Sequence, residues 1–399
     1  MSGPDLLFEY ASEVLAFDFK DAPPVVVPSD PSPSAVTRMA ERCAAAFTRS
    51  GKAHLALLGL GSGTVAEALS KLMPPGALFV CEQDLGLARL LLTKGRLLWC
   101  QPDGGCAPAR LALDASPWAL LFLLDRAGVD LSQIMVLPNP ELPPAEKARL
   151  RLLELLLTRS EAVTLPGSAL LPKLSAAAIL SPDEPGLPQF FAQLPNWLFE
   201  LAIVWDADVI PDIPVPQDFP VWQSAHRLER DFSAQRNLML AACRGDFVLY
   251  LDADEGFSSH DWDVLPRLCA VPGVGGWLFP RVTLYPEPDR VLTGFGLWPD
   301  MQLRLFRRTQ ELCFFNPVHE RLTGLCGRQG LALDLELVHL SRIRKSEAEL
   351  RRKLQGFDEA GTGLVRHALS VEYPSVPRDL VSPRASSVQR GLLLPSELG

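Results

Sequence analysis

The stretch from Arg230 to Phe257 reads RDFSAQRNLMLAACRGDFVLYLDADEGF and carries the densest chemical signal in the chain. Its pattern predicts a helix over 232–243 and then an apolar strand over 247–251. That strand runs straight into three carboxylates: Asp252, Asp254 and Glu255. Open α/β sheets bind their ligands at the carboxyl ends of their strands, so we expect a binding site at this edge.

The acidic run suits a hard divalent cation. Carboxylate oxygens are the ligands that Mg²⁺ and Mn²⁺ prefer. A cation of this kind would balance the charge of a diphosphate leaving group. The alternative is a solvated acidic turn after a core strand, and the residues alone leave both interpretations open.

Strand and helix signals alternate in two regions of the chain. The first region opens with an apolar run at 54–58, a glycine turn and a helix, and a second strand follows over 77–81. The second region contains the strand LSAAAIL from Leu174 and another strand over 201–205, ahead of the stretch quoted above. This alternation predicts an α/β fold, with a Rossmann-like, doubly wound parallel sheet in the first region.

Prolines mark the boundaries between these regions. Five prolines between residues 22 and 33 resist helix formation, four more occur between 137 and 144, and proline and serine accumulate from Tyr373. We therefore divide the chain into a lead-in over 1–33, a Rossmann-like domain over 34–165, a second α/β domain over 172–345, a helical segment over 346–372 and a mobile tail over 373–399.

The glycine turn of the first region has the spacing of a cofactor site. Gly59, Gly61 and Gly63 follow a strand and precede a helix, and Glu82 ends the next strand. Glycines let the backbone approach a ligand closely, and the acid would bind ribose hydroxyls of a nucleotide or of S-adenosylmethionine. Such turns are common, so a structural turn is the alternative.

Composition excludes several classes of protein. The 399 residues carry a formal net charge of -9, which disfavours a general nucleic-acid binder. No run approaches the ~20 apolar residues of a membrane-spanning helix, and the N-terminus lacks the pattern of a secretory signal. We expect a cytoplasmic protein, for which peripheral contact with a membrane stays open.

Several segments between 172 and about 345 occur in the order seen in one enzyme family. They are LSAAAILSPDE ending at Glu184, NWLFELAIVWDAD with Asp206 at the end of its strand, DFSAQRN ending at Arg236 and Asn237, LDADE with Asp252 and Asp254, PDMQLRLFRR around Arg304, PVHE with His319 and Glu320, and LVHLSR with His339. The ordered set resembles the family 2 glycosyltransferases of the nucleotide-sugar-binding GT-A fold. It is most similar to the branch of lipopolysaccharide core glucosyltransferases.

This resemblance implies a metal-dependent transferase that takes a nucleotide-diphospho-sugar as donor. Asp206 would then hold the nucleobase end of the donor, Asp252 would contact the sugar nucleotide, and Asp254 would bind Mg²⁺ or Mn²⁺. His339 stands where some relatives complete the metal site, and a packed core histidine is the alternative. The other implied donor-binding residues are Glu184, Arg236, Asn237 and Arg304, although Arg304 equally suits a pair with an acid.

The resemblance also places a catalytic base. Transfer with inversion needs a carboxylate that accepts the proton of the acceptor hydroxyl. Glu320 is the first candidate, because the PVHE segment would lie on the acceptor side, and Glu255 is the second. The implied acceptor is a saccharide, lipid-linked or protein hydroxyl, as in bacterial cell-surface glycans. The segment WDADVIPDIP replaces the family's Asp-x-Gly-Ser-Thr-Asp pattern, so the nucleotide stays open.

Two other functions compete with glycosyl transfer. The first region resembles the Rossmann-like amino-terminal domains of bacterial motility-associated glycosyltransferases, and its glycine turn would also suit an S-adenosylmethionine-dependent methyltransferase. The altered acids after the 201–205 strand instead favour a scaffold that binds nucleotide sugars without turnover. The sequence determines neither the oligomeric state nor the donor sugar.

Overall fold

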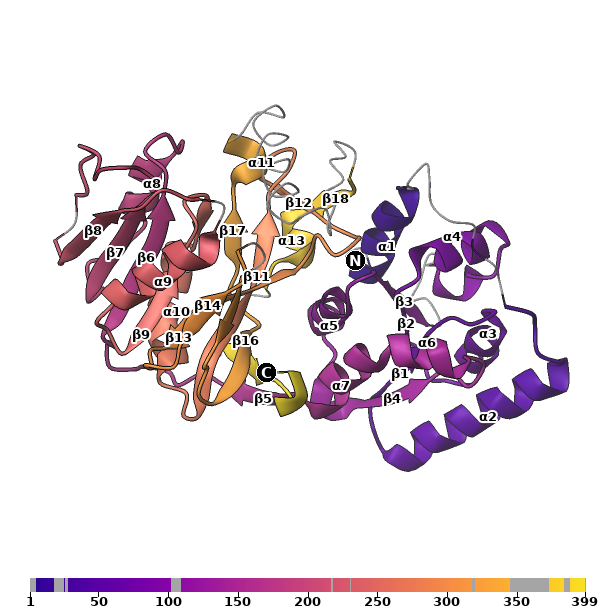
Figure 1. The fold of residues 1–399 in the computed structure, drawn as a ribbon. Coiled ribbons are helices and arrows are strands. Elements are labelled where there is room, and N and C mark those ends of the chain that lie inside the picture. Colours follow the sequence, from indigo (N-terminus) through magenta and orange to yellow (C-terminus); the bar gives the residue numbers. More distant parts are fainter. Residues whose placement is uncertain are drawn as a thin grey trace. The chain divides into compact units, whose positions relative to one another are not determined.

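The computed structural model describes residues 5–17, 25, 28–101, 109–216, 218–229, 231–317, 320–344, 373–383 and 388–398. The chain separates into two compact units, each made of three segments. The first unit contains 1–160, 289–299 and 372–384, and the second contains 161–288, 300–371 and 385–399. Figure 1 shows the elements of both.

The first unit is built on a four-stranded parallel sheet of order β3-β2-β1-β4. The strands are β1 (His54–Leu58), β2 (Leu78–Glu82), β3 (Arg110–Leu113) and β4 (Ile134–Pro138). They form because short apolar runs are buried, as strands of a parallel sheet require. The predicted parallel sheet is therefore confirmed.

Helices lie around this sheet (Figure 1). Ser32 caps α2 (Pro33–Ser50) through its side-chain oxygen, Pro33 fits its first turn, and Gly51 ends it with φ 65°. The other helices are α3 (Thr64–Ser70), α4 (Leu85–Thr93), η1 (Leu98–Cys100), α5 (Pro117–Arg126), η2 (Leu131–Gln133), α6 (Pro144–Arg149) and α7 (Arg151–Arg159).

Parts of the predicted lead-in and tail are ordered elements of the first unit. Helix α1 (Leu6–Ala16) lies within the lead-in over 1–33 and buries Leu7, Tyr10 and Val14. Strand β18 (Ser375–Pro377) pairs antiparallel with β12 (Arg290–Leu292), and α13 (Arg378–Val381) follows it. The mobile tail predicted from 373 is wrong here, because Val376 and Val381 are buried.

The second unit is built on a large mixed sheet with the order β5-β19-β16-β11-β13-β9-β6-β7-β8. Strands β9, β6, β7 and β8 are parallel, and β13 pairs antiparallel with β9 and β11. Its strands are β5 (Glu161–Thr164), β6 (Leu174–Leu180), β7 (Glu200–Trp205), β8 (Val221–Ala225), β9 (Phe247–Tyr250), β10 (Glu255–Gly256), β11 (Val274–Thr283), β13 (Asp300–Arg307), β16 (Arg328–Ala332), β17 (Leu337–His339) and β19 (Arg390–Leu393).

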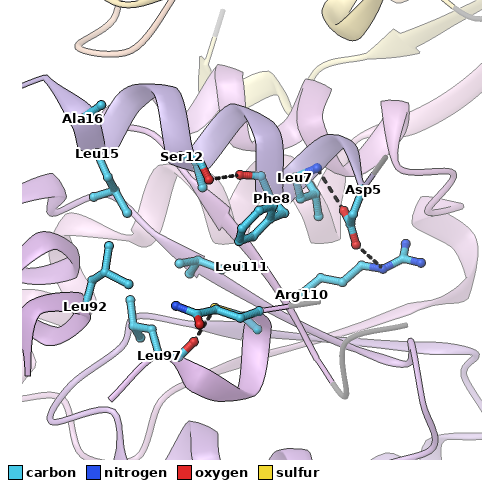
Figure 2. A pocket seen from close by; sticks show the side chains of 13 residues that line it. Asp5, Leu7, Phe8, Ser12, Leu15, Ala16, Leu92, Leu97, Arg110 and Leu111 are labelled. Carbon is cyan, nitrogen blue, oxygen red and sulfur yellow. Dashed lines mark hydrogen bonds and ion pairs between the residues drawn. The ribbon is translucent and has the colours of Figure 1, made fainter. Parts of the chain in front are cut away.

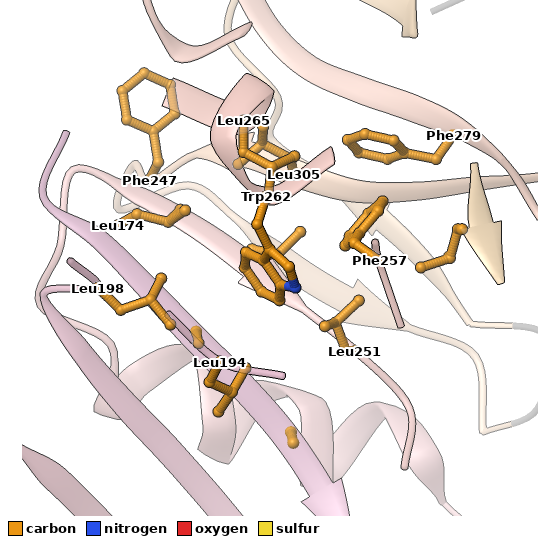
Figure 3. Close-up of a cluster of buried hydrophobic side chains, with 14 of the residues drawn as sticks. Leu174, Leu194, Leu198, Phe247, Leu251, Phe257, Trp262, Leu265, Phe279 and Leu305 are labelled. Atoms are coloured by element: carbon orange, nitrogen blue, oxygen red, sulfur yellow. The ribbon is translucent and has the colours of Figure 1, made fainter. Parts of the chain in front are cut away.

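The sheet of the second unit has a core on each face. On β6, Ala176, Ala178 and Leu180 join one cluster and Ala177 joins the other, as alternation along a strand requires. Helices α8 (Leu187–Ala192) and α10 (Ser259–Cys269) contribute to the first cluster, where Figure 3 shows the Trp262 ring among aliphatic and aromatic side chains. Helix α9 (Phe232–Ala242) packs on the opposite face through Met239 and Leu240.

The remaining elements are short. A two-stranded hairpin consists of β14 (Cys313–Phe315) and β15 (Arg321–Thr323), and α11 (Ser341–Arg344) follows β17. Near the end of the chain, η3 (Ser396–Leu398) follows β19. The helical segment predicted over 346–372 lies outside the described residues, and the division into two domains stays a prediction.

Candidate active site

Three acidic segments follow adjacent parallel strands of the second unit. Glu184 lies in the turn after β6, Asp206 directly follows β7, and Asp252 lies two residues beyond β9. Because β9, β6 and β7 are neighbours in the parallel part of the sheet, these segments leave it at the same edge. The predicted acidic edge is thus a feature of the fold.

Asp252 is held by two arginines. Its Oδ2 accepts from Nη2 of Arg304 at 2.7 Å, and its Oδ1 lies 3.5 Å from Nη2 of Arg236. Burial by itself raises the pKa of Asp252, but the charges of Arg304 and Arg236 hold this pKa well below its usual range. Asp252 is therefore a carboxylate at neutral pH, and 36% of its side chain is exposed.

Glu255 is enclosed rather than open to a substrate. Its side chain has no exposed surface, and its carboxylate accepts from Arg304 at 2.6 Å, from Arg281 at 3.0 Å and from the Asp252 backbone at 3.1 Å. Arg281 also pairs with Asp300. Glu255 thus balances buried arginines, which is a poor setting for the second candidate base.

Glu320 lies at the same edge, and Arg236 brings it there. The Arg236 Nε donates to Oε1 of Glu320 while its Nη2 faces Asp252, so one guanidinium joins the two acids. The guanidinium also lies over the ring of Tyr250, 4.6 Å from its centroid. Glu320 and Asp252 are therefore neighbours in the structure, separated by one arginine side chain. His319 lies outside the described residues.

Asn237 connects two elements. Its Nδ2 donates to the Phe314 carbonyl and its Oδ1 accepts from the Phe314 N–H, both at 2.8 Å. The side chain therefore fastens β14 to α9. We expected a contact with the donor at this position, and the structure uses the amide within the protein instead.

Asp254 and His339 meet beside the network. Nε2 of His339 lies 3.5 Å from Oδ1 of Asp254, and Nδ1 of His339 lies 3.0 Å from the Thr283 hydroxyl. The pairing of β10 with β17 sets this register. Across the described residues, no group of three or more His, Cys, Asp or Glu side chains is arranged to hold a metal ion. The pair fits Mg²⁺ or Mn²⁺ only as a partial ligand set, which phosphate oxygens would complete.

Asp206 organises the loop that follows β8. Its Oδ1 accepts from the Leu228 N–H at 2.6 Å, and the Gln235 amide donates to the His226 carbonyl in the same loop at 2.6 Å. This contact orders the backbone beside the position that we expect for the nucleobase.

Sequence reasoning missed three members of the network. Arg281 and Asp300 extend it beyond Glu255, and the Tyr250 ring lies 4.4 Å from the guanidinium of Arg304 as well as beneath Arg236. The signal for Arg281 that sequence reasoning overlooked is a charged residue within the apolar run VGGWLFPRVT of β11.

The glycine turn of the first unit is occupied by the protein's own side chains. Gly61 and Gly63 have φ of 59° and 85°, as the predicted turn requires, and Gly59 also has positive φ. Yet the Glu141 carboxylate accepts from the Ser62 N–H at 2.7 Å and from the Val65 N–H at 3.0 Å. These are the donors that a phosphate would need, and a side chain at Gly61 would collide with Glu141.

Glu82 is likewise satisfied internally. The carboxylate is 1% exposed and accepts at 2.7 Å from the N–H groups of Leu60, Gln83 and Asp84. Its two oxygens therefore stabilise the turn and are not presented to a ribose. This geometry gives no support to the methyltransferase alternative.

A cavity of about 270 Å³ lies elsewhere in the first unit, between α1, α4 and β3 (Figure 2). Its walls are mostly aliphatic, and its charged residues Asp5 and Arg110 face each other at 3.5 Å. Burial raises the pKa of the lining Cys100 thiol to about 12, so it is not a nucleophile at neutral pH. Neither the glycine turn nor Glu82 lines this cavity.

The second unit thus has a layered α/β fold with a charged edge of acids and arginines, which is typical of enzymes that handle anionic ligands together with a cation.

No protein-family model matches the chain, and no curated protein matches it. No helix among the described residues is both long and apolar enough to cross a membrane.

Solved structures give local likenesses. TarS residues 1–349 from S. aureus has a TM-score of 0.32 and 12% identity over 50% of this chain and 67% of its own. GalNAc-T7, solved with UDP, GalNAc and Mn²⁺, has a TM-score of 0.29 and 10% identity over 48% of each chain. The likeness covers only 28% of a longer TarS chain. TM-scores this low carry no activity from either protein to this chain.

Proposed function

We propose that the second unit transfers a sugar from a nucleoside-diphosphate donor to the hydroxyl of a saccharide, lipid-linked or protein acceptor, with inversion. One observation carries the proposal. Asp252, which follows the parallel strand β9, and Glu320, which comes from the distant β14–β15 hairpin, share the guanidinium of Arg236. A solvated acidic turn would not need a carboxylate from another element.

Asp254 and His339 would hold the divalent cation. Their facing atoms are 3.5 Å apart, and a site with so few protein ligands suits Mg²⁺ or Mn²⁺ that also binds substrate phosphates. The cation would stabilise the charge of the departing diphosphate. Asp206 and Glu184, at the ends of the neighbouring strands, would line the nucleotide side.

Glu320 would act as the base. It would accept the proton of the attacking hydroxyl as that oxygen bonds to the anomeric carbon and the bond to the diphosphate breaks. Nη2 of Arg304 donates to both Asp252 and Glu255, and its charge keeps Asp252 in the carboxylate form. Because carboxylates balance both Arg304 and Arg236, the charge of the donor diphosphate would be balanced mainly by the bound cation.

The test is release of nucleoside diphosphate from a panel of donors: UDP-glucose, UDP-galactose, UDP-GlcNAc and GDP-mannose, each with and without Mn²⁺. We expect turnover of at least one donor only with the metal. Asp254→Ala and Glu320→Gln should each lower kcat by about 10²–10⁴-fold, the usual contribution of a positioned acid–base group or metal contact. Glu161→Gln, at an exposed acid paired with Arg328, is the matched control and should keep its turnover.

Two results would count against this proposal. Wild-type turnover in both site variants would remove the catalytic assignment. A donor that raises the melting temperature of the chain without any turnover would favour the non-catalytic scaffold.

A further inference from the structure

Arg236 is fixed from three directions. Its Nε donates to Oε1 of Glu320, its Nη2 lies 3.5 Å from Oδ1 of Asp252, and the Tyr250 ring lies against its face. Only 10% of the side chain is exposed. A guanidinium restrained in this way has little freedom to turn toward a ligand.

Glu320, by contrast, comes from a short hairpin. Among the described residues, the hydrogen bonds that hold this hairpin come largely from one helix, α9. Besides Arg236, the Asn237 amide binds the Phe314 backbone at 2.8 Å, and the Phe232 N–H donates to the Pro317 carbonyl at 2.9 Å. Helix α9 therefore supplies these hydrogen bonds, including the one to the Glu320 carboxylate, while Phe314 of the hairpin packs against Tyr250 and Phe306 of the large sheet.

We propose that Arg236 is a positioning residue that acts through Glu320 and not through the donor. This inference rests on the proposed function and changes the donor-binding role that the family resemblance implies for Arg236. Arg236 holds Oε1, so the other carboxylate oxygen, Oε2, is the one that takes the proton.

In the absence of another acceptor, water is the attacking group and the donor is hydrolysed. A water O–H gives its proton to Oε2 of Glu320 as the water oxygen bonds to the anomeric carbon. The bond from that carbon to the diphosphate oxygen breaks, and its electron pair leaves with the diphosphate. Arg236 remains protonated throughout, so its contribution is geometric.

The experiment compares Arg236→Gln, Arg236→Lys, Glu320→Gln and the double variant R236Q/E320Q. UDP-glucose with Mn²⁺ is the first probe, and the panel donor with the fastest wild-type release replaces it if turnover of UDP-glucose is slower. Nucleoside diphosphate release gives kcat and KM, and the rise in melting temperature with donor and Mn²⁺ reports binding independently of activity.

We expect Arg236→Gln to lower kcat by about 100-fold, the cost of misplacing a reacting group by about an ångström. Its KM and its donor-induced rise in melting temperature should stay close to wild type. The kcat of Arg236→Lys should lie between those of wild type and Arg236→Gln, since lysine keeps the charge but cannot reproduce the Nε–H contact. In the Glu320→Gln background, Arg236→Gln should change kcat less than about 2-fold, because the two residues act as one unit.

Other outcomes overturn the proposal. If Arg236→Gln raises KM and abolishes donor-induced stabilisation, Arg236 binds the donor. If its effect multiplies with that of Glu320→Gln, the two residues act independently. Arg390→Gln, which breaks another ion pair to a buried acid at Asp334, controls for general loss of stability and should keep kcat. If wild type releases no nucleotide from any donor, the proposed function fails and this role fails with it.

Discussion

At the scale of single residues, the second unit is organised by alternation of charge. Contacts run from Glu320 through Arg236 to Asp252, and from there through Arg304 to Glu255. Arg281 and Asp300 continue the same chain. Each interior charge faces two of opposite sign, which offsets the cost of removing these groups from water. The acids of this network differ in exposure: Asp252 is partly exposed, whereas Glu255 is fully buried and has a structural role.

Glu255 and Asp254 should separate stability from activity. Glu255→Gln leaves Arg304 and Arg281 with one fewer buried counter-charge, so we expect a loss of about 3–5 kcal/mol in the free energy of unfolding. Asp254→Ala should lower that free energy much less while it removes metal-dependent turnover. Urea denaturation of both variants, monitored by tryptophan fluorescence, gives the comparison. Equal loss of stability in the two variants would contradict the assignment of Glu255 as a structural counter-charge.

At the scale of elements, the β19 strand shows what sequence composition conceals. It lies between β16 and β5 in the sheet of the second unit, and Leu392 is 2% exposed. Its neighbours in the sequence are serine, proline and glycine, which is why the stretch reads as a tail. A four-residue strand is stabilised by its two partner strands, and these come from residues 161–164 and 328–332.

Substitution within β19 tests this pairing. Leu392→Ala should cost about 2–5 kcal/mol of unfolding free energy, the usual range for truncating a buried leucine. Val388→Ala, at a position 46% exposed in the same terminal segment, should change it by less than about 0.5 kcal/mol. Thermal and urea denaturation provide the measurement. If both variants matched wild type, this terminal stretch would not belong to the folded core.

At the scale of the whole molecule, each unit is assembled from segments far apart in the sequence. In the first unit, hydrogen bonds link the three segments, and one of them binds a buried acid. The Tyr10 hydroxyl of α1 donates to Asp114 at 2.7 Å, and the Gly294 N–H donates to the Tyr10 oxygen at 3.2 Å. Residue 293 in turn bonds to Pro374 of the third segment. Asp114 has no exposed surface.

This arrangement predicts a pH dependence of stability. Burial raises the pKa of Asp114 to about 7, against its hydrogen bonds from Tyr10 and Ser116. The folded state therefore holds a proton that the unfolded state releases near pH 4, so the contribution of Asp114 is fully present below that pH. It is lost as the pH rises toward 7. We expect Asp114→Asn to lose less stability than wild type between pH 5 and 8, by several degrees in Tm. Parallel pH profiles of Tm for the two proteins would rule this out.

Much of the fold follows from local pattern. The apolar runs at 54–58, 174–180 and 247–250 are strands because their residues are buried on both faces, and the helix from Phe232 begins at its Asp231 cap. The position of an acidic edge after β9 follows as well, since a parallel strand delivers what comes after it to one edge. The roles of the individual site residues stay predictions.

Periodicity and strand direction are local properties, so the sequence predicts the parallel sheet of the first unit and the acidic turn after β9, and the family resemblance adds a candidate base. The three-dimensional fold was needed to find which carboxylate each arginine neutralises, that Asn237 binds a backbone, and that Glu141 fills the glycine turn. The contacts of Asn237 with Phe314, of Glu141 with Ser62 and of Arg236 with Glu320 join residues 77 to 84 positions apart. Charge pairing acts through space, and spacing along a chain does not encode which charges meet.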